Sequence, residues 1–521
     1  MATSYRFILL FAVLLEAAFL SLHRLDNFKL QAVEFIATYL LASLLYLVCC
    51  FLITNSGGDG VLSRRWIGLI WGAGILFRLT VFPLDPMLSE DLNRYRWQGK
   101  LQAAGGNPYT EVPQDPRWES LRDATYPSVN RKDLPSVYGP VLERFYVACY
   151  RLVSALEPDE GKQVWWFKAP FALFEIAVAM ALGGLLTALG LPRQWLLIYL
   201  WSPLTIVEFW AQGHNDALAV LFMVLALTSA LKQRWVWGWS WLTLAALTKF
   251  WPAILFPFFL VQREGERWRF RYRAALVAIP IALAVSWPYL DGISKVEAVL
   301  AGFVGGWRNN DSLYALIYWA VDQDFNAGTM WVKRLLAGGL ALLWANYLWG
   351  RSLWANWGWM SPGGAGNREA ETRAVKTQPA DARAANTRAE NRQAAKVQAA
   401  NRHDHVETVL PATERAVARA DPLSLIRSAK WAVLLLLFLA ANCFPWYLSW
   451  LLPFLVIFPN AALLLWTALV SLSYHILIRY ELLGVWQDSD EFRLMEYVPV
   501  YAMLIGGALW RLARSRFVTR Q

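Results

Sequence analysis

The chain has 521 residues, of which 57% are hydrophobic and only 17% are charged, and its formal net charge at pH 7 is +10. Soluble domains carry roughly 25% charged residues, so the composition excludes an ordinary water-soluble enzyme and favours a polytopic membrane protein. The surplus of Lys and Arg is expected in cytoplasmic loops, and it gives no reason to expect a nucleic-acid partner.

Cysteine and histidine usage predicts no metal or redox site. Cys49, Cys50, Cys149 and Cys443 lie in apolar or aromatic surroundings without Cys-x-x-Cys spacing, which is typical of packing residues. The five histidines show neither His-Glu-x-x-His nor paired spacing. We therefore expect no resident cofactor and no dedicated metal site, while the adjacent acids Glu90 and Asp91 leave a metal requirement open.

Three apolar stretches, residues 7–22, 32–53 and 66–82, are predicted to be transmembrane helices. The first lacks the small-residue cleavage site of a secretory signal peptide. The loop between the second and third ends in Arg64-Arg65, which predicts that it is cytoplasmic. The third span is then expected to deliver the following residues to the extracytoplasmic side.

A polar segment, residues 85–109, follows the third span and reads DPMLSEDLNRYRWQGKLQAAGGNPY. Its adjacent carboxylates, Glu90 and Asp91, could supply a general base, because a low-dielectric wall raises the basicity of a carboxylate. Aromatic rings offer flat apolar faces to sugars, and the Asn107-Pro108-Tyr109 turn fixes the return of the loop. The alternative is a solvated loop whose acids cap a short interfacial helix.

The pattern S-E-D-x-x-R-Y-x-W-x-G, followed by G-x-N-P-Y, resembles the first large extracytoplasmic loop of GT-C glycosyltransferases. The resemblance is to bacterial polyprenol-phosphate-dependent mannosyltransferases and, more distantly, to GPI-anchor mannosyltransferases. The chain has Gln98 where the family usually has an acidic residue, and two extra helices precede the loop. The resemblance implies that Asp91 is the catalytic base, and that the substrate is bound by Glu90, Arg94, Tyr95, Trp97, Asn107 and Tyr109.

Tyr138-Gly139-Pro140 opens an apolar stretch that runs to residue 156. It carries Glu143, Arg144 and Arg151, charges that are costly in a lipid-exposed span, so we expect an interfacial or re-entrant helix. The family has a similar aromatic-proline motif, which implies that Tyr138 shapes the site. A role in forming the turn fits this residue equally well.

Spans 167–189 and 195–210 are predicted next, and they leave the cluster Gln212-Gly213-His214-Asn215-Asp216 at the outer end. The cluster could simply cap the following helix, 217–231. Ionisable groups at the membrane are nevertheless candidates for function. The family has a similar Gly-His-Asn-Asp signature, which implies that His214, Asn215 and Asp216 face the site.

Lys249 lies between two apolar arms, residues 239–247 and 253–261, beside Pro252. A charge at this depth costs several kcal/mol unless it is paired, which predicts an anionic partner. The Lys-x-x-Pro element resembles one that lies by the donor's phosphate in GT-C enzymes, so Lys249 is expected to contact that phosphate. The alternative is a lysine that extends to the membrane interface.

A basic loop, residues 263–273, is expected on the cytoplasmic side, and a second outer loop covers 288–326. The outer loop contains Trp307-Arg308-Asn309-Asn310-Asp311-Ser312, similar to a W-x-x-N-x-S element of the family. This similarity implies that Arg308, Asn310 and Asp311 lie near the sugar or phosphate, whereas a solvated loop is equally compatible with the residues.

The predicted fold is an all-α polytopic membrane protein, a GT-C-like bundle of about 14 transmembrane helices with interfacial helices in large outer loops. Residues 351–427 are rich in Ala, Arg, Asn, Glu and Gln and are expected to form a disordered cytoplasmic insertion. The other predicted parts are two additional N-terminal helices (1–65), a catalytic module (66–350, with outer loop 85–166) and C-terminal helices (428–521).

The resemblance implies transfer of a hexose, by preference mannose, from a polyprenyl-phosphate sugar to an acceptor hydroxyl, with inversion. The expected place is the extracytoplasmic face of the inner (plasma) membrane, and the expected partners are the lipid-linked donor, a lipid- or glycan-linked acceptor and membrane lipids. A transporter or flippase of a glycolipid is the alternative from another class. Transfer of an aminosugar or pentose to lipid A or protein is the alternative among enzymes.

Overall fold

The structure is a computed structural model that describes residues 2–55, 64–264, 267–293, 295, 308–349 and 422–518. Residues 351–421 of the predicted insertion lie outside the described residues, as does most of the predicted cytoplasmic loop before Arg64. The prediction that the insertion extends to residue 427 differs from the structure, because a helix already begins at Pro422. Its apolar residues, including Leu423, Leu425 and Ile426, pack into the core and so favour helix at this point.

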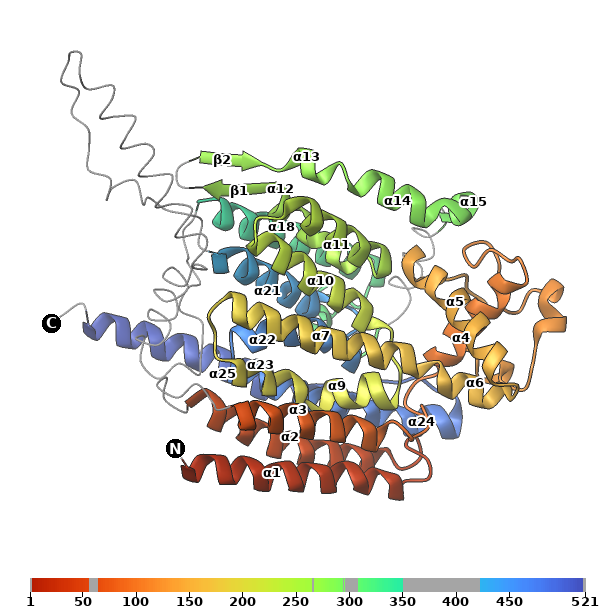
Figure 1. Cartoon of the computed structure of the whole chain (residues 1–521), viewed down its shortest axis with the longest axis horizontal. Helices are drawn as coiled ribbons and strands as arrows, with labels where there is room; N and C mark the ends of the chain where they lie inside the picture. Colours follow the sequence, from red (N-terminus) through yellow and green to blue (C-terminus); the bar gives the residue numbers. More distant parts are fainter. Residues whose placement is uncertain are drawn as a thin grey trace, which may run out of the picture.

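Long helices lie roughly parallel in one bundle, and a smaller helical module covers one end of it (Figure 1). The module contains α4 (Asp91–Ala103), α5 (Pro140–Leu156) and α6 (Glu160–Trp166). The first half of the bundle contains α1 (Ala2–Ser21), α2 (Ala32–Asn55), α3 (Arg64–Val81), α7 (Lys168–Ala188), α8 (Leu197–Leu200), α9 (Pro203–Thr205), α10 (Asp216–Leu231), α11 (Trp235–Thr248) and α12 (Phe256–Leu260).

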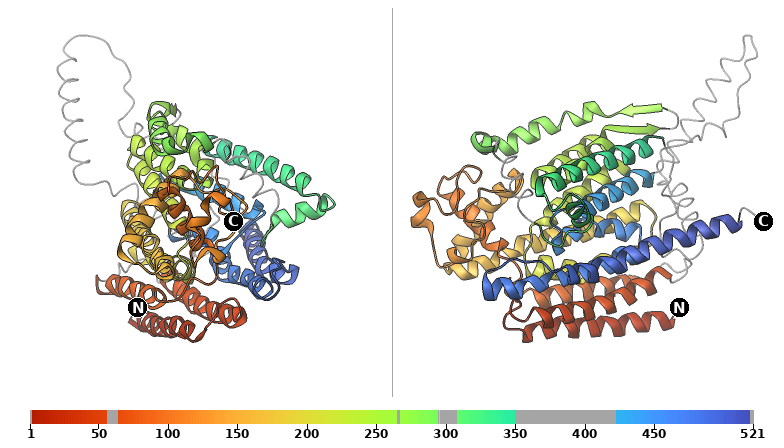
Figure 2. Two further views of the ribbon diagram at one scale, coloured as in Figure 1. Left: turned by 90° about the vertical axis from the view of Figure 1, so that its right-hand side faces the viewer. Right: turned by 180° about the vertical axis from the view of Figure 1, so that it is seen from behind.

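The second half begins with a chain of short helices and ends with the longest one. Figure 2 shows α25 running along the side of the bundle toward the end opposite to the module. The elements are α13 (Tyr272–Ala275), α14 (Ala278–Ser286), α15 (Leu290–Ile293), α17 (Leu313–Ala320), α18 (Phe325–Trp349), α21 (Pro422–Leu439), α22 (Leu452–Ile457), α23 (Ala461–Leu469), α24 (Ile476–Leu483) and α25 (Asp490–Val518).

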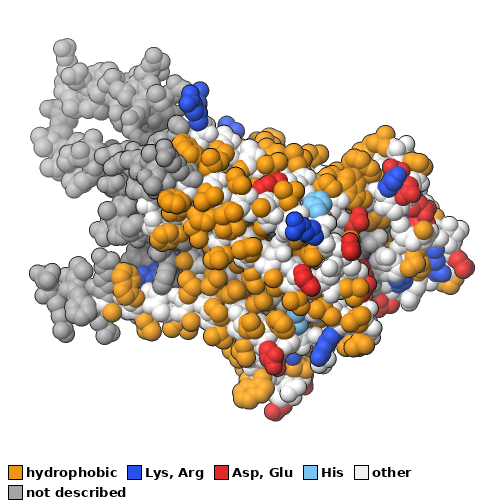
Figure 3. Space-filling view, turned by 90° about the horizontal axis from the view of Figure 1, so that it is seen from below, with side chains coloured by type: hydrophobic (Ala, Val, Ile, Leu, Met, Phe, Trp, Pro, Cys, Tyr) orange, Lys and Arg blue, Asp and Glu red, His pale blue; other side chains and the backbone are white. Residues whose placement is uncertain are grey.

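The apolar surface of the bundle identifies a membrane protein. Among the described residues, five helical segments are long and apolar enough to cross a bilayer. Figure 3 shows hydrophobic side chains over the middle of one face, with charged side chains gathered toward one end. The five segments are Phe7–Arg24, Ala32–Asn55, Glu160–Ala188, Tyr272–Gly292 and Ala461–Leu483. The total of about 14 crossings stays a prediction.

The predicted straight span 195–210 is instead a broken segment. Two short helices, α8 and α9, are followed by a π-helical turn, Ile206–Ala211. Residues 196–220 are all buried, and irregular backbone is tolerated at membrane depth only where protein surrounds it. Pro203 interrupts the helix, and the π-helical turn directs Glu208 inward.

The predicted basic loop 263–273 contains a small antiparallel hairpin, the one departure from an all-α fold among the described residues. Strand β1 (Val261–Glu264) pairs with β2 (Arg267–Phe270), and Val261 lies opposite Phe270. Aromatic residues alternate with arginines through β2, a period of two that favours strand. The hairpin lies at the end of the bundle opposite to α4 and α5 (Figure 1).

A fully buried ion pair ties α3 to α7. The Arg78 guanidinium donates to both oxygens of Glu175 at 2.6 and 2.8 Å and also to the carbonyls of Gly74 and Leu200. The Trp210 indole donates to Glu175 at 2.9 Å, so the carboxylate is fully engaged. Sequence reasoning missed this pair because its members lie 97 residues apart.

Arg78→Met is expected to destabilise the protein by about 3–5 kcal/mol, because it leaves the Glu175 charge buried and unpaired. The double variant Arg78→Met/Glu175→Leu removes both charges and is expected to lose less. Thermal unfolding of the purified proteins in one detergent measures both. A double variant less stable than Arg78→Met would contradict the explanation by an unpaired charge.

Candidate active site

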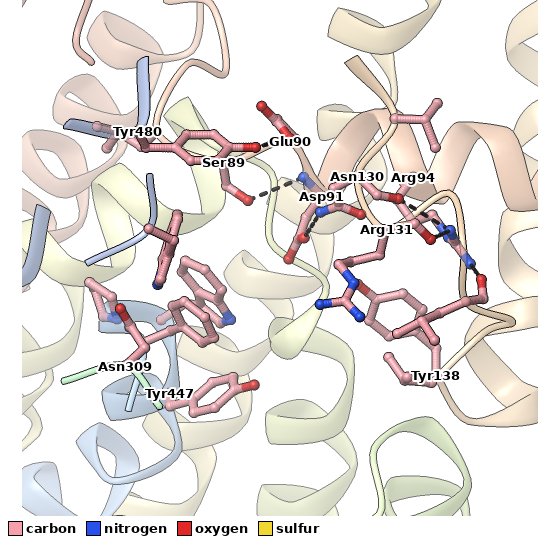
Figure 4. A pocket seen from close by; sticks show the side chains of 18 of the residues that line it. Ser89, Glu90, Asp91, Arg94, Asn130, Arg131, Tyr138, Asn309, Tyr447 and Tyr480 are labelled. Carbon is pink, nitrogen blue, oxygen red and sulfur yellow. Dashed lines mark hydrogen bonds between the residues drawn. The ribbon is translucent and has the colours of Figure 1, made fainter. Parts of the chain in front are cut away.

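A cavity of about 970 Å³ opens where α4 and its neighbouring loop meet the bundle (Figure 4). Its volume is at the upper end of the range for small-molecule sites. Segments far apart in the chain contribute to its wall, and the polar and aromatic residues among them include Lys29, Glu90, Asp91, Arg94, Asn130, Arg131, Tyr138, Lys249, Trp251, Asn309, Trp446, Tyr447, Trp450 and Tyr480.

Asp91 is the first residue of α4 and faces this cavity. Its Oδ1 accepts a hydrogen bond from the Asn130 amide at 2.8 Å, and its Oδ2 accepts one from the Tyr95 hydroxyl at 3.3 Å. Burial raises the pKa of the Asp91 carboxyl above its usual range, although the Asn130 hydrogen bond and the charge of Lys249 oppose this. The helix-opening and the catalytic interpretations of the acid pair are therefore compatible for Asp91.

Arg94 holds the loop that covers Asp91. Its guanidinium donates to the carbonyls of Asn130, Arg131 and Leu134 at 3.2, 2.8 and 2.6 Å. With its amide oxygen turned inward, Gln98 accepts from Arg94 at 2.9 Å. Gln98 is fully buried and is not part of the cavity wall. Arg94 thus fixes the Asn130 side chain against Asp91.

The opposite wall is aromatic. Tyr447 stacks on Trp450 at 4.4 Å between ring centroids, and Trp450 stacks on Trp251 at 4.7 Å. Trp446 stacks on Phe444 at 4.6 Å. Stacked rings present a broad, rigid apolar surface to a ligand at little cost in conformational entropy. A sugar ring and an apolar chain both fit such a wall.

Lys249 extends from the end of α11 into the cavity and has an internal partner. Its Nζ lies 2.7 Å from Asp216 Oδ2, and the Trp450 indole donates to the other oxygen at 2.7 Å. The Tyr447 ring lies 5.6 Å from Nζ. Asp216 is thus an anionic partner of Lys249 inside the protein, Lys249 still lines the cavity, and its contact with the donor's phosphate stays a prediction.

A close contact places Tyr138 beside this lysine. The Gly139 amide donates to the Thr248 carbonyl at 3.1 Å, one residue before Lys249. A Cβ atom at Gly139 would lie 2.1 Å from the Leu247 carbonyl oxygen, so only glycine fits here. The turn Tyr138-Gly139-Pro140 thus joins the outer module to the lysine hairpin and brings Tyr138 to the cavity wall.

Several predicted site residues support the wall from behind and do not line the cavity. Tyr95 lies under Asp91, and the buried Trp97 packs on Tyr126. Asn107 accepts from the Tyr109 amide at 3.0 Å, and the Tyr109 hydroxyl donates to the Tyr138 carbonyl at 2.7 Å. These contacts fix the loop, and direct binding of substrate by these side chains stays a prediction.

The Gly-His-Asn-Asp corner is also buried behind the wall. Asn215 donates to the Tyr146 hydroxyl at 2.5 Å, and Asp216 opens α10 while it binds Lys249. His214 stacks on Trp446 at 3.8 Å between ring centroids and is only 1% exposed. From behind the wall, His214 thus contacts Trp446 and approaches Asp91, and Asp216 contacts Lys249.

Arg308, Asn310 and Asp311 do not reach the cavity wall. Arg308 pairs with Asp311 at 2.8 Å, and Asn310 donates to Glu496 at 3.2 Å. The neighbouring residue Asn309 does line the cavity. This part of the second outer loop is fastened to α25, and contact of these three residues with sugar or phosphate stays a prediction.

The rim of the cavity includes a lysine from the N-terminal helical pair. Lys29 Nζ lies 3.2 Å from Glu90 and 3.2 Å from Glu481. The Tyr480 hydroxyl donates to Glu90 at 3.3 Å. Glu90 is therefore neutralised at the rim, whereas Asp91 points inward, and the two adjacent acids are distinct in their surroundings.

Residues 12–263 match the MptA_B family model, which is described as alpha-(1->6)-mannopyranosyltransferase, N-terminal domain. The match covers just under half of the chain, and these residues are similar to that mannosyltransferase family. Comparisons with curated proteins and with solved structures gave no match. The matched range includes the cavity residues Asp91, Asn130 and Lys249, and also Asp216, the partner of Lys249.

Sequence reasoning missed one partner of each of the two adjacent acids. Asn130 and Tyr480 carry no motif, and only the fold brings them to Asp91 and Glu90. For Trp446 and Tyr447, the Pro-Trp-Tyr pattern at the end of an apolar span was the available indication. No cluster of three or more His, Cys, Asp or Glu side chains suited to a metal ion occurs in the part of the chain that the structure describes.

Proposed function

We propose that the protein transfers mannose from a polyprenyl-phosphate mannose to a hydroxyl of a lipid- or glycan-linked acceptor at the extracytoplasmic face of the membrane. The observation that carries the proposal is the shared cavity, in which the desolvated carboxylate of Asp91 and the ammonium group of Lys249 lie with an aromatic wall. The family's α-(1->6)-mannopyranosyl activity supports the choice of sugar.

Asp91 would act as the general base. Its Oδ1 has one lone pair engaged by Asn130 and a second available for the acceptor hydroxyl. The hydroxyl oxygen would attack the anomeric carbon as Asp91 takes its proton, and the bond from that carbon to the phosphate oxygen would break. Attack from the face opposite the leaving group inverts the configuration, so a β-linked donor would give an α-linked product.

Lys249 would stabilise the departing polyprenyl phosphate. A cation near the leaving oxygen lowers the barrier when negative charge develops there. Asp216 holds the lysine side chain in place and Trp450 holds Asp216, so the cation is preorganised. The stacked rings of Trp251, Trp450 and Tyr447 would accommodate the apolar parts of the donor.

The test is transfer by wild-type protein in proteoliposomes with a membrane-extracted acceptor. Radiolabelled polyprenyl-phosphate mannose, polyprenyl-phosphate glucose and GDP-mannose would be offered separately, and the product's anomeric configuration would be read by NMR. We expect transfer from the first donor only, with an α-linked product. Transfer from the nucleotide sugar, or retention of configuration, would contradict the proposal.

The pH dependence of transfer is expected to report Asp91. The base must be ionised, so kcat/KM falls as the pH drops through its pKa; because burial raises that pKa, the fall occurs at higher pH than for an ordinary aspartate. Asn130→Ala removes a hydrogen bond that favours the ionised form and is expected to move the fall to still higher pH. Ser128→Ala, an exposed change in the same loop, serves as the control and is expected to keep the wild-type profile.

A further inference from the structure

Four polar side chains, Asp91, His214, Glu208 and Tyr474, form a row that leads from Asp91 into the bundle. His214 Nδ1 lies 3.8 Å from Asp91 Oδ2, and His214 Nε2 lies 3.4 Å from Glu208 Oε2. The other Glu208 oxygen accepts a hydrogen bond from the Tyr474 hydroxyl at 2.7 Å. Both His214 and Glu208 are almost completely buried, and neither lines the cavity.

Three atoms in this row make no hydrogen bond to any described residue. They are His214 Nδ1, His214 Nε2 and Glu208 Oε2. A buried polar atom without a partner costs roughly 1–3 kcal/mol, so three adjacent ones call for an explanation. A shift of less than about 1 Å would bring each gap to hydrogen-bond distance.

With Asp91 ionised, as a general base requires, only one arrangement of protons on a neutral ring gives each of these atoms a partner. If Glu208 were ionised it would take the proton on Nε2, and the lone pair of Nδ1 would then face the Asp91 carboxylate. If Glu208 is protonated, it donates to Nε2, and the Nδ1 proton points at Asp91 Oδ2. Burial, with the charge of Lys249, lowers the pKa of His214 well below its usual range, which favours the neutral ring.

The π-helical turn and the stack on Trp446 fix this geometry. The His214 amide donates to the Glu208 carbonyl at 3.0 Å, so the turn that carries Glu208 also positions the histidine backbone. Gly213 has φ of +73°, which lets the chain reverse there. Trp446 covers the imidazole face and separates it from the cavity.

We propose that His214, held by a protonated Glu208, is the positioning residue of Asp91, donating from Nδ1 to Oδ2 so that Oδ1 receives the acceptor's proton. This inference rests on the proposed function, since it assigns a partner to the base. It changes the interpretation of the Gly-His-Asn-Asp corner: His214 would act through Asp91 and would not touch the sugar.

Other groups next to this row also influence the protonation of Asp91 and Glu208, and the experiment must allow for them. Asp91 receives hydrogen bonds from α4 and the covering loop and feels an ion pair nearby, while Glu208 is faced by two tyrosines. These groups are Tyr95, Asn130, Lys249, Asp216, Tyr474 and Tyr39. They are unchanged in every variant below, so a change in the pH profile is attributable to the substituted residue, His214 or Glu208.

The test compares three changes at His214. The amide nitrogen of Asn stands where Nδ1 stands in histidine, whereas that of Gln stands where Nε2 stands, and Phe keeps only the ring. We expect His214→Asn to keep kcat within about threefold of wild type, and His214→Gln and His214→Phe to lose roughly 10- to 100-fold, as for a lost hydrogen bond to a charged group. In the latter two, the acidic fall in kcat/KM moves to higher pH, while the KM for the donor is unchanged.

Glu208 supplies a second, independent comparison. Glu208→Gln can donate to Nε2 and accept from Tyr474 as a protonated glutamate does, so it is expected to retain activity and pH profile. Glu208→Leu is expected to behave as His214→Phe. Thermal unfolding in detergent would verify that each variant is folded, and the Asn/Gln pair keeps the comparison interpretable if Phe or Leu is not accommodated.

The outcomes separate the inference from the proposed function. If wild-type protein transfers mannose and His214→Phe has the same kcat and pH profile, or Asn and Gln are equally impaired, the inference alone is overturned. Loss of activity in Glu208→Gln would overturn the protonated state of Glu208 within it. If wild-type protein transfers no mannose from the polyprenyl-phosphate donor, the proposed function fails, and the inference falls with it.

Discussion

Asp91→Asn is expected to lower kcat for mannose transfer by about 10²- to 10⁴-fold, the range that positioned general bases contribute. The amide has nearly the shape of the carboxylate but cannot take a proton from the acceptor hydroxyl. Asn130 and Tyr95, which donate to the two oxygens of Asp91, would retain one acceptor between them. Initial rates in proteoliposomes at saturating donor and acceptor would measure the loss.

The matched control is Asp115→Asn in the same outer region. Asp115 accepts from Arg117 at the start of a short helix and does not line the cavity. We expect it to retain wild-type kcat. An unchanged melting temperature in Asp91→Asn would show that lost activity reflects lost chemistry, and a fully active, folded Asp91→Asn would remove Asp91 as the base.

The local motifs identified two residues that the structure places on one cavity, because each motif carries its own chemistry. Asp91 in the Ser-Glu-Asp segment and Lys249 in the Lys-x-x-Pro element both line this cavity, and their roles stay predictions. Charges next to apolar spans are costly, so their positions in the sequence already indicate that something must partner them. The identity of the partners is set by tertiary packing, and the sequence left open whether Lys249 meets a phosphate or Asp216.

Contacts that join distant segments could not be predicted. Tyr480 bonds to Glu90 across 390 residues, and the bonds of Arg94 to the covering loop are made to backbone carbonyl groups, which every residue possesses. The resemblance implies that Arg94 binds substrate, and this stays a prediction, since Arg94 lines the cavity. In the structure it secures the loop that carries Asn130, a role that leaves no pattern in the sequence.

The apolar pattern predicted which residues are helical more accurately than where helices break. Helices α2 and α3 agree with the predicted spans to within two residues at each end. The predicted span 195–210 is broken because it is surrounded by protein, and burial on all sides removes the periodicity that would reveal a break. The π-helical turn that carries Glu208 arises in this region, so Glu208, the partner of the predicted residue His214, was not predicted.

Lys249→Ala is expected to raise the KM for the polyprenyl-phosphate donor by roughly 10- to 100-fold, the value of a hydrogen bond to a charged group. The KM for the acceptor should change much less, because the lysine is assigned to the phosphate. This change also leaves Asp216 without its cation, and a buried carboxylate with only Trp450 as donor is destabilising by itself. The single variant therefore cannot separate the two effects.

The double variant Lys249→Ala/Asp216→Asn separates them. It removes the orphaned charge, while the amide oxygen introduced at position 216 can still accept from Trp450. If Lys249 binds the donor phosphate, the double variant regains stability but keeps the raised donor KM. If the lysine serves only to neutralise Asp216, the double variant recovers the wild-type KM as well. Donor titrations and thermal unfolding of the single and double variants would therefore decide whether Lys249 binds the donor phosphate or serves only to neutralise Asp216. Lys249→Arg, which retains the charge, is measured beside them.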